Sequence, residues 1–134
     1  MNKEVKALWL DALRSGDYVQ GKYALRTEDN TFCCLGVLCD LAVKAGIQED
    51  GTLTDSRQTL HEGVTYQYDD VEGQGVANNM LPVKVAKWAG IDTPGSLPRW
   101  FHGEQGEEFV ALWELNDELN MSFGQIADVI EEQF

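Results

Sequence analysis

The segment Cys34-Leu-Gly-Val-Leu-Cys-Asp-Leu-Ala-Val-Lys-Ala-Gly46 is apolar around almost its whole circumference. A helix that is hydrophobic on every side is normally buried among other elements, and Gly46 stands where a helix commonly ends. We therefore predict that residues 34–46 form the central helix of the core. The chain has 134 residues, a length that fits one domain over residues 1–134.

Three further helices are expected around this segment. Their apolar residues recur at helical spacing, and Gly or Pro residues mark several of their ends. In the last of them, Ser122 and Gln125 have the spacing of a capping box. The expected helices cover residues 2–14, the segment that starts with Pro82 and ends at Gly90, and the segment that follows Ser122.

The remaining segments predict short strands and loops. Residues 18–32 read as an extended stretch, a turn at residues 28–30 and a short strand, and hence as a hairpin. Residues 107–115 fit either a helix or a strand. About four helices with a small sheet of short strands make an α+β domain. The other predictions are strands at 51–54 and 64–68, an acidic Gly-rich loop at 69–75, and a long loop at 91–106.

The charge is negative and unevenly distributed. Ten Lys and Arg residues stand against 23 Asp and Glu, which gives a formal net charge of −13. Residues 68–134 hold 3 basic and 13 acidic side chains, and no Lys or Arg follows Arg99. Such a surface repels phosphate backbones, so we expect no direct nucleic-acid binding. It favours a basic protein partner.

Membrane insertion and secretion are not expected. No apolar run reaches the roughly 20 residues that span a bilayer. Three clustered cysteines, Cys33, Cys34 and Cys39, fit free thiols in a reducing compartment. We therefore expect a cytoplasmic protein. The cysteines also lack the paired spacing of a zinc site, so neither a metal nor a cofactor is predicted.

Cys34 is the candidate nucleophile. A thiol at the first turn of a helix feels the helix N-terminal field, which lowers its pKa. A cysteine hydrolase also needs an imidazole base, and His61 and His102 are the available histidines. The competing interpretation is that Cys34 packs as a small buried hydrophobe.

A second candidate site is the aromatic loop Leu97-Pro-Arg-Trp-Phe-His102. Arg99, Trp100, Phe101 and His102 form a set typical of interface anchors or of stacking on a planar ligand. The same residues could instead cap the core. We expect this loop, together with the acidic C-terminal half, to contact a partner.

Two resemblances bear on function. The run Phe32-Cys-Cys-Leu-Gly36, with Ala45-Gly46 a helix later, resembles the nucleophile segment of NlpC-type cysteine peptidases. Cys33 and Leu35 replace the Asp and Ser of that family's motif, and neither histidine is followed by the apolar strand that carries its base. The resemblance implies a cysteine hydrolase or acyl transferase with Cys34 as nucleophile.

More of the chain resembles an uncharacterised family of small phage and prophage proteins. The resemblance implies an accessory protein in the host cytoplasm that binds a host or defence component. We expect a non-enzymatic role, with a basic protein site or a small nucleotide-like signalling ligand as target. A virion assembly factor is the third alternative. The matching segments are residues 9–25, Phe32-Cys-Cys-Leu-Gly-Val-Leu-Cys-Asp40, residues 81–90 and Leu115-Asn-Asp-Glu-Leu-Asn-Met-Ser-Phe-Gly-Gln-Ile-Ala-Asp128.

Overall fold

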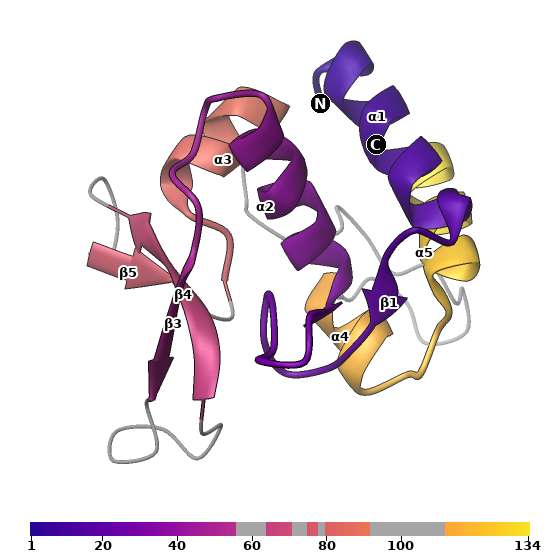
Figure 1. Cartoon of the computed structure of the whole chain (residues 1–134). Coiled ribbons are helices and arrows are strands. Elements are labelled where there is room, and N and C mark those ends of the chain that lie inside the picture. The colour runs from indigo at the N-terminus through magenta and orange to yellow at the C-terminus, as the bar shows by residue number, and fades with distance from the viewer. Residues whose placement is uncertain (56–63, 71–74, 78–79, 92–111) are drawn as a thin grey trace.

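Helix α2 (Cys34–Lys44) lies at the centre of the fold, as its composition predicts. The computed structural model describes residues 1–55, 64–70, 75–77, 80–91 and 112–134. Cys34, Leu35, Val37, Leu38 and Cys39 all have 0% exposure. Figure 1 shows two helices, α1 (Lys3–Ser15) and α5 (Phe123–Gln133), on one side of α2, with a small sheet on the other side.

Helix α1 begins where a side chain can satisfy its first backbone donors. The Asn2 Oδ1 accepts from Glu4 N at 2.9 Å and from Val5 N at 3.0 Å. The helix ends at Gly16, whose φ of 81° is the left-handed conformation that glycine adopts easily. The fully buried Trp9 donates from Nε1 to Cys34 O at 3.0 Å, so α1 is fixed to the start of α2.

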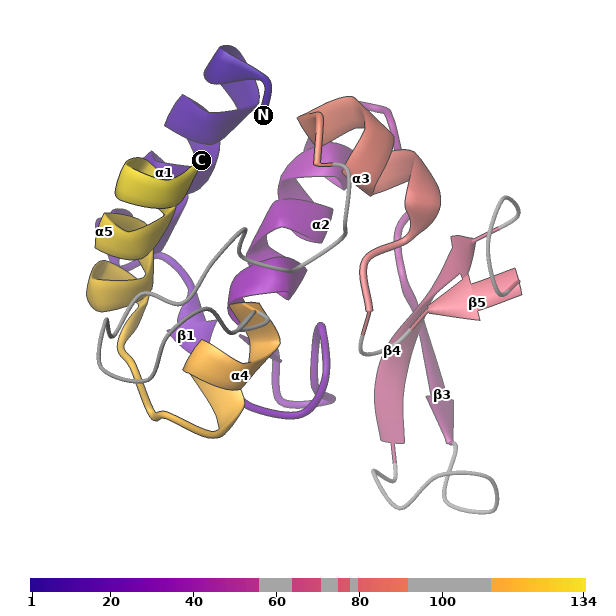
Figure 2. The same ribbon diagram turned by 180° about the vertical axis from the view of Figure 1, so that it is seen from behind.

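Helices α1 and α5 pack side by side and run in opposite directions (Figure 2). The predicted capping box of α5 is confirmed, because Ser122 Oγ accepts from Gln125 N and Gln125 Oε1 accepts from Ser122 N. Lys6 Nζ donates to Glu131 O at 3.0 Å. The N- and C-terminal ends therefore lie near each other.

Helix α3 (Val83–Ala89) packs against α2. Pro82 is its N-cap and not its first helical residue, a difference of one position from the prediction. The side chain that caps the helix comes from strand β4 (Val64–Asp70), since Val83 N donates to Asp70 Oδ1 at 2.9 Å. Asp70 is only 6% exposed. The expectation of a loop from Asp69 onward was therefore wrong at its start, because Asp69 and Asp70 belong to a strand whose last residue caps α3.

Two small groups of strands complete the α+β fold. Strands β3 (Thr52–Asp55), β4 (Val64–Asp70) and β5 (Gly75–Ala77) form an antiparallel sheet in that order. Strands β1 (Val19–Gln20) and β2 (Thr31–Phe32) pair in parallel. The hairpin prediction for residues 18–32 was therefore wrong. The turn at residues 28–30 is present, and the chain closes across it through an isolated antiparallel Arg26–Phe32 bridge and hydrogen bonds between Thr27 and Thr31.

Helix α4 (Leu112–Asp117) raises the number of helices in the described residues from the predicted four to five. Its first four residues belong to the segment 107–115, which fits either a helix or a strand by sequence. Its Leu112 and Leu115 are fully buried, and it contacts α2 and α5. Among the helices that the structure describes, none is long and apolar enough to cross a membrane.

Candidate functional site

Cys34 lies in the core and not at a surface. Its side chain is 0% exposed, and Sγ donates to Leu112 O at 3.5 Å. Burial raises the pKa of the Cys34 thiol well above its ordinary value, and the nearby Cys33 and Asp117 add to the rise. The expectation of a helix-lowered pKa was therefore wrong, because desolvation of the sulfur outweighs the field of the helix terminus.

The two other thiols are buried as well. Cys33 is the N-cap of α2, and its Sγ accepts from Gly36 N at 3.4 Å. Burial raises its pKa to about 12. Burial also raises the pKa of Cys39. All three cysteines are free of disulfides. A thiol without solvent access and with a raised pKa is a poor nucleophile.

The other predicted site residues lie outside the described part of the chain. These are the candidate bases His61 and His102 and the loop residues Arg99, Trp100 and Phe101. Their contribution to a site therefore stays a prediction.

The acidic C-terminal half is less uniform than its composition suggests. Asp117 is only 7% exposed, and its Oδ1 accepts from Asn116 Nδ2 at 2.7 Å. On α5, Asp128 and Glu131 both pair with Arg14, at 2.8 and 3.0 Å. Three of these carboxylates are thus engaged within the protein.

A pocket of about 540 Å³ lies between the segment 22–29 and the first residues of β4. Its volume is in the range of small-molecule binding sites. Thr27 and Thr65 form an isolated antiparallel bridge, and Tyr66 N donates to Arg26 O at 3.0 Å, so the two walls are joined. The lining residues are Lys22, Tyr23, Ala24, Thr27, Glu28, Asp29, Val64 and Thr65.

Thr65 brings an unused polar group to this pocket. The residue is only 3% exposed, and among the described residues its Oγ1 has no hydrogen-bond partner. Buried polar atoms are nearly always hydrogen-bonded, and a hydroxyl can both donate and accept. A ligand group that reaches Thr65 would satisfy this atom.

The rim of the pocket combines an aromatic ring with charges. Tyr23 is 58% exposed, and its φ of 69° is unusual for a bulky residue. Glu28 and Asp29 are exposed, and both line the pocket. Lys22 is also exposed, but its Nζ donates to Asn120 Oδ1. The pocket therefore offers two carboxylates and one ammonium that already has a partner.

A buried network of amides holds the start of this segment. Gln20 Nε2 donates to Asn116 Oδ1 at 2.8 Å and to Met121 O at 2.7 Å. Asn116, which is 0% exposed, donates in turn to Gly21 O at 2.8 Å. Phe123 N donates to Gln20 Oε1 at 3.2 Å. These bonds tie the residues before the pocket to α4 and α5.

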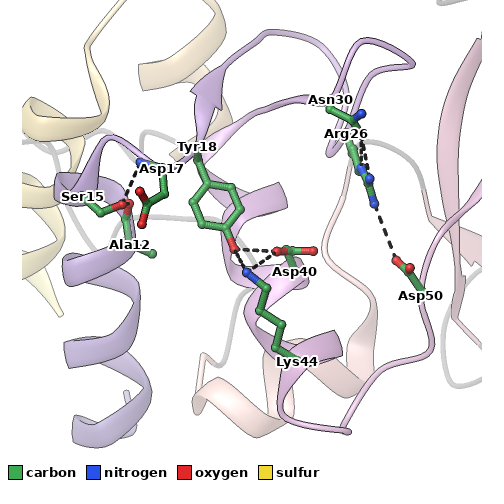
Figure 3. Close-up of polar contacts among 9 residues, drawn as sticks. All are labelled: Ala12, Ser15, Asp17, Tyr18, Arg26, Asn30, Asp40, Lys44 and Asp50. Carbon is green, nitrogen blue, oxygen red and sulfur yellow. Dashed lines mark hydrogen bonds and ion pairs between the residues drawn. The ribbon is translucent and has the colours of Figure 1, made fainter.

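Arg26 packs beside the pocket wall. Its guanidinium carbon lies 3.9 Å from the centre of the Tyr66 ring and 5.4 Å from that of Phe32. Asn30 Oδ1 accepts from Arg26 Nε at 2.9 Å and from Arg26 Nη2 at 2.6 Å (Figure 3). Asp50 Oδ1 lies 3.6 Å from Arg26 Nη1. Arg26 is thus engaged by aromatic rings, an amide oxygen and a carboxylate.

A second polar group in Figure 3 joins α2 to the segment that follows α1. Tyr18 donates to Asp40 Oδ2 at 2.5 Å and accepts from Lys44 Nζ at 3.0 Å. Burial, and then the hydrogen bond to Asp40, raises the pKa of Tyr18. The half-buried ring also packs edge-on against Phe32 at 5.0 Å. These contacts are those of a structural link.

The sequence contained only part of the signal for this pocket. The turn at residues 28–30 was recognised, but no pattern marked Thr65, because its burial depends on a bridge to a residue 38 positions away. Within the described residues, no group of three or more His, Cys, Asp or Glu side chains is arranged to hold a metal ion.

Comparison with known proteins gives one result. No curated protein and no solved structure matches the chain. A family model described as a domain of unknown function, DUF8296, matches residues 1–134. The chain therefore belongs to the DUF8296 family.

Proposed function

We propose that this protein is a non-enzymatic binding protein that accepts a basic side chain of a partner protein in the pocket formed by residues 22–29 and 64–65. The observation that carries the proposal is the pocket itself. Its volume is about 540 Å³, Glu28 and Asp29 line it, and the buried Thr65 hydroxyl in its wall has no partner among the described residues. A cationic group that donates hydrogen bonds complements all three side chains.

The charge of the whole chain supports the same class of partner. A formal net charge of −13 attracts a basic protein at long range and speeds the first encounter. It disfavours a nucleotide-like ligand, because phosphates would meet Glu28 and Asp29 in the pocket. Of the two targets expected from the sequence, a basic protein site is therefore the better supported.

The proposed role is that of an accessory protein in the host cytoplasm. The free and buried thiols fit a reducing compartment, which supports a cytoplasmic role. The resemblance of residues 9–25 and 115–128 to small phage proteins supports an accessory role against a host or defence component. In the structure these two segments meet through the Gln20–Asn116 contact.

Binding of a labelled basic peptide tests the proposal. The probe is a short peptide of alternating Lys, Arg and Gly residues, and an equally long peptide of Glu and Gly is the negative probe. We expect the basic peptide alone to bind. The double variant Glu28→Gln/Asp29→Asn should bind it at least about tenfold more weakly, since each desolvated charged contact contributes about 1 kcal/mol or more.

A charge-matched control separates the pocket from the overall charge. The variant Asp11→Asn/Glu132→Gln removes two exposed carboxylates from α1 and α5. It should bind the peptide nearly as well as the unaltered protein. Equal losses in the two double variants would show that only the overall charge attracts the peptide, and would overturn the proposal.

A further inference from the structure

The chemistry of the pocket distinguishes between the two basic side chains of proteins. We propose that its preferred occupant is the guanidinium group of an arginine on the partner protein, and not the ammonium group of a lysine. This inference rests on the proposed function and names the ligand class for the same pocket. Three features of the pocket lead to it.

The first feature is the exposed ring of Tyr23. Its left-handed backbone, with a φ of 69°, holds a side chain that is 58% exposed at the rim. A planar guanidinium stacks on an aromatic face, whereas an ammonium is a compact and strongly hydrated point charge. A stacking surface therefore favours arginine.

The second feature is the distribution of acceptors. Glu28 and Asp29 are exposed, while the Thr65 hydroxyl is buried in the wall. A guanidinium carries five N–H donors in a rigid fork, so one group can reach acceptors at different depths together. An ammonium concentrates its three donors at one atom, which suits a single carboxylate.

The third feature is the way this part of the fold binds its own arginine. Arg26 lies over Tyr66 and Phe32, and its guanidinium contacts Asn30 Oδ1 and Asp50. Thr65, which precedes Tyr66 on β4, lines the pocket together with Val64. This part of β4 thus already holds one guanidinium, while the adjoining pocket has the same kinds of partner and no guanidinium among the described residues.

Three peptides that differ at one position test the inference. They carry arginine, lysine or the neutral isostere citrulline at the centre of an otherwise uncharged sequence, and their affinities are measured by calorimetry. We expect arginine to bind about tenfold more tightly than lysine, and citrulline more weakly than both. The variant Tyr23→Leu should remove most of the difference between arginine and lysine while binding to both persists. Thr65→Val, which keeps the shape, should weaken arginine binding more than lysine binding.

The outcomes distinguish the two proposals. Equal affinity for arginine and lysine would overturn the arginine preference and leave a pocket for basic side chains. An arginine preference that stays undiminished in both Tyr23→Leu and Thr65→Val would also overturn the inference, because the pocket would not be its cause. If none of the peptides bound at millimolar concentration, the proposed function itself would fail. Far-ultraviolet circular dichroism of each variant shows that the fold is retained.

Discussion

At the scale of single residues, the surroundings of a side chain decide its chemistry. Cys34 follows a short strand and opens a helix, a position that can activate a thiol. In the fold, however, its sulfur contacts Leu112 O and has no exposed surface. Thr65 shows the reverse case, because an ordinary strand residue becomes a candidate ligand-binding group through its position in a pocket wall.

The burial of the three thiols gives a prediction at this scale. Iodoacetamide at neutral pH should modify Cys33, Cys34 and Cys39 very slowly in the folded protein, since they are 0 to 2% exposed and their pKa values are raised. In denaturant all three should react at the rate of a free thiol. Mass spectrometry over time gives both rates. Fast labelling of Cys34 alone in the folded state would contradict this picture and restore the hydrolase hypothesis.

At the scale of elements, one glycine lets two segments approach closely. Gly36 lies inside α2, and a Cβ there would be 1.7 Å from Leu25 O. The backbone of the pocket segment 22–29 approaches the helix closely at this point. Glycine is unfavourable inside helices, so its presence in α2 is explained by this contact with the backbone.

A matched pair of glycine substitutions tests that contact. Gly36→Ala should destabilise the protein by at least about 3 kcal/mol, because the added methyl group meets a backbone carbonyl that cannot move freely. Gly124→Ala is the control, since at this exposed position of α5 an added Cβ has no neighbour closer than Ser122 Oγ at 3.9 Å. It should stabilise the fold by about 0.5 kcal/mol. Urea unfolding measures both, and a Gly36→Ala protein as stable as the original would contradict the contact.

How well the sequence predicted each element depends on the origin of its signal. Helices α1 and α2 were predicted within about two residues, and the start of α5 was predicted at its capping box, because spacing, caps and end signals are local. Strands β1 and β2 were assigned the wrong partnership, since parallel pairing of Val19–Gln20 with Thr31–Phe32 depends on the path of the chain between them. Strand β5 is only three residues long and went unrecognised. The sequence did not predict the pocket, because its two walls, residues 22–29 and 64–65, are far apart in the chain.

At the scale of the whole molecule, acidity has both internal and external roles. Asp70 caps α3, Asp117 is bound to Asn116, and Asp128 and Glu131 hold Arg14. The carboxylates at the pocket belong to the first half of the chain, which is nearly balanced in charge. The location of a carboxylate therefore matters more than the sum of charges, and it directs the proposal to residues 22–29.

The buried thiols also make stability dependent on pH. The pKa of Cys33 rises from 9.0 in an ordinary thiol to about 12 in the fold, and burial raises the pKa of Cys39 and Tyr68 as well. Between pH 9 and about 12 the folded state binds more protons than the unfolded state. The contribution of the protonated, buried Cys33 thiol to stability is therefore complete below pH 9 and is lost as the pH rises toward about 12. The urea midpoint of the reduced protein should fall between about pH 8 and about pH 10.5.

A variant with one titrating thiol removed checks the cause of that pH dependence. Cys39→Ala should be less stable at neutral pH because it leaves a small cavity, but its midpoint should fall less over the same pH range. An unaltered midpoint in the original protein across this range would contradict the raised pKa values.

We claim that a basic ligand occupies the pocket, and a titration followed by nuclear magnetic resonance decides this. Isotope-labelled protein is titrated with the arginine peptide, and amide shifts are followed for every assigned residue. We predict the largest shifts at residues 22–29 and at Thr65, with little change at the exposed carboxylates of α5. Shifts spread evenly over the acidic surface, or concentrated on α5, would contradict the claim.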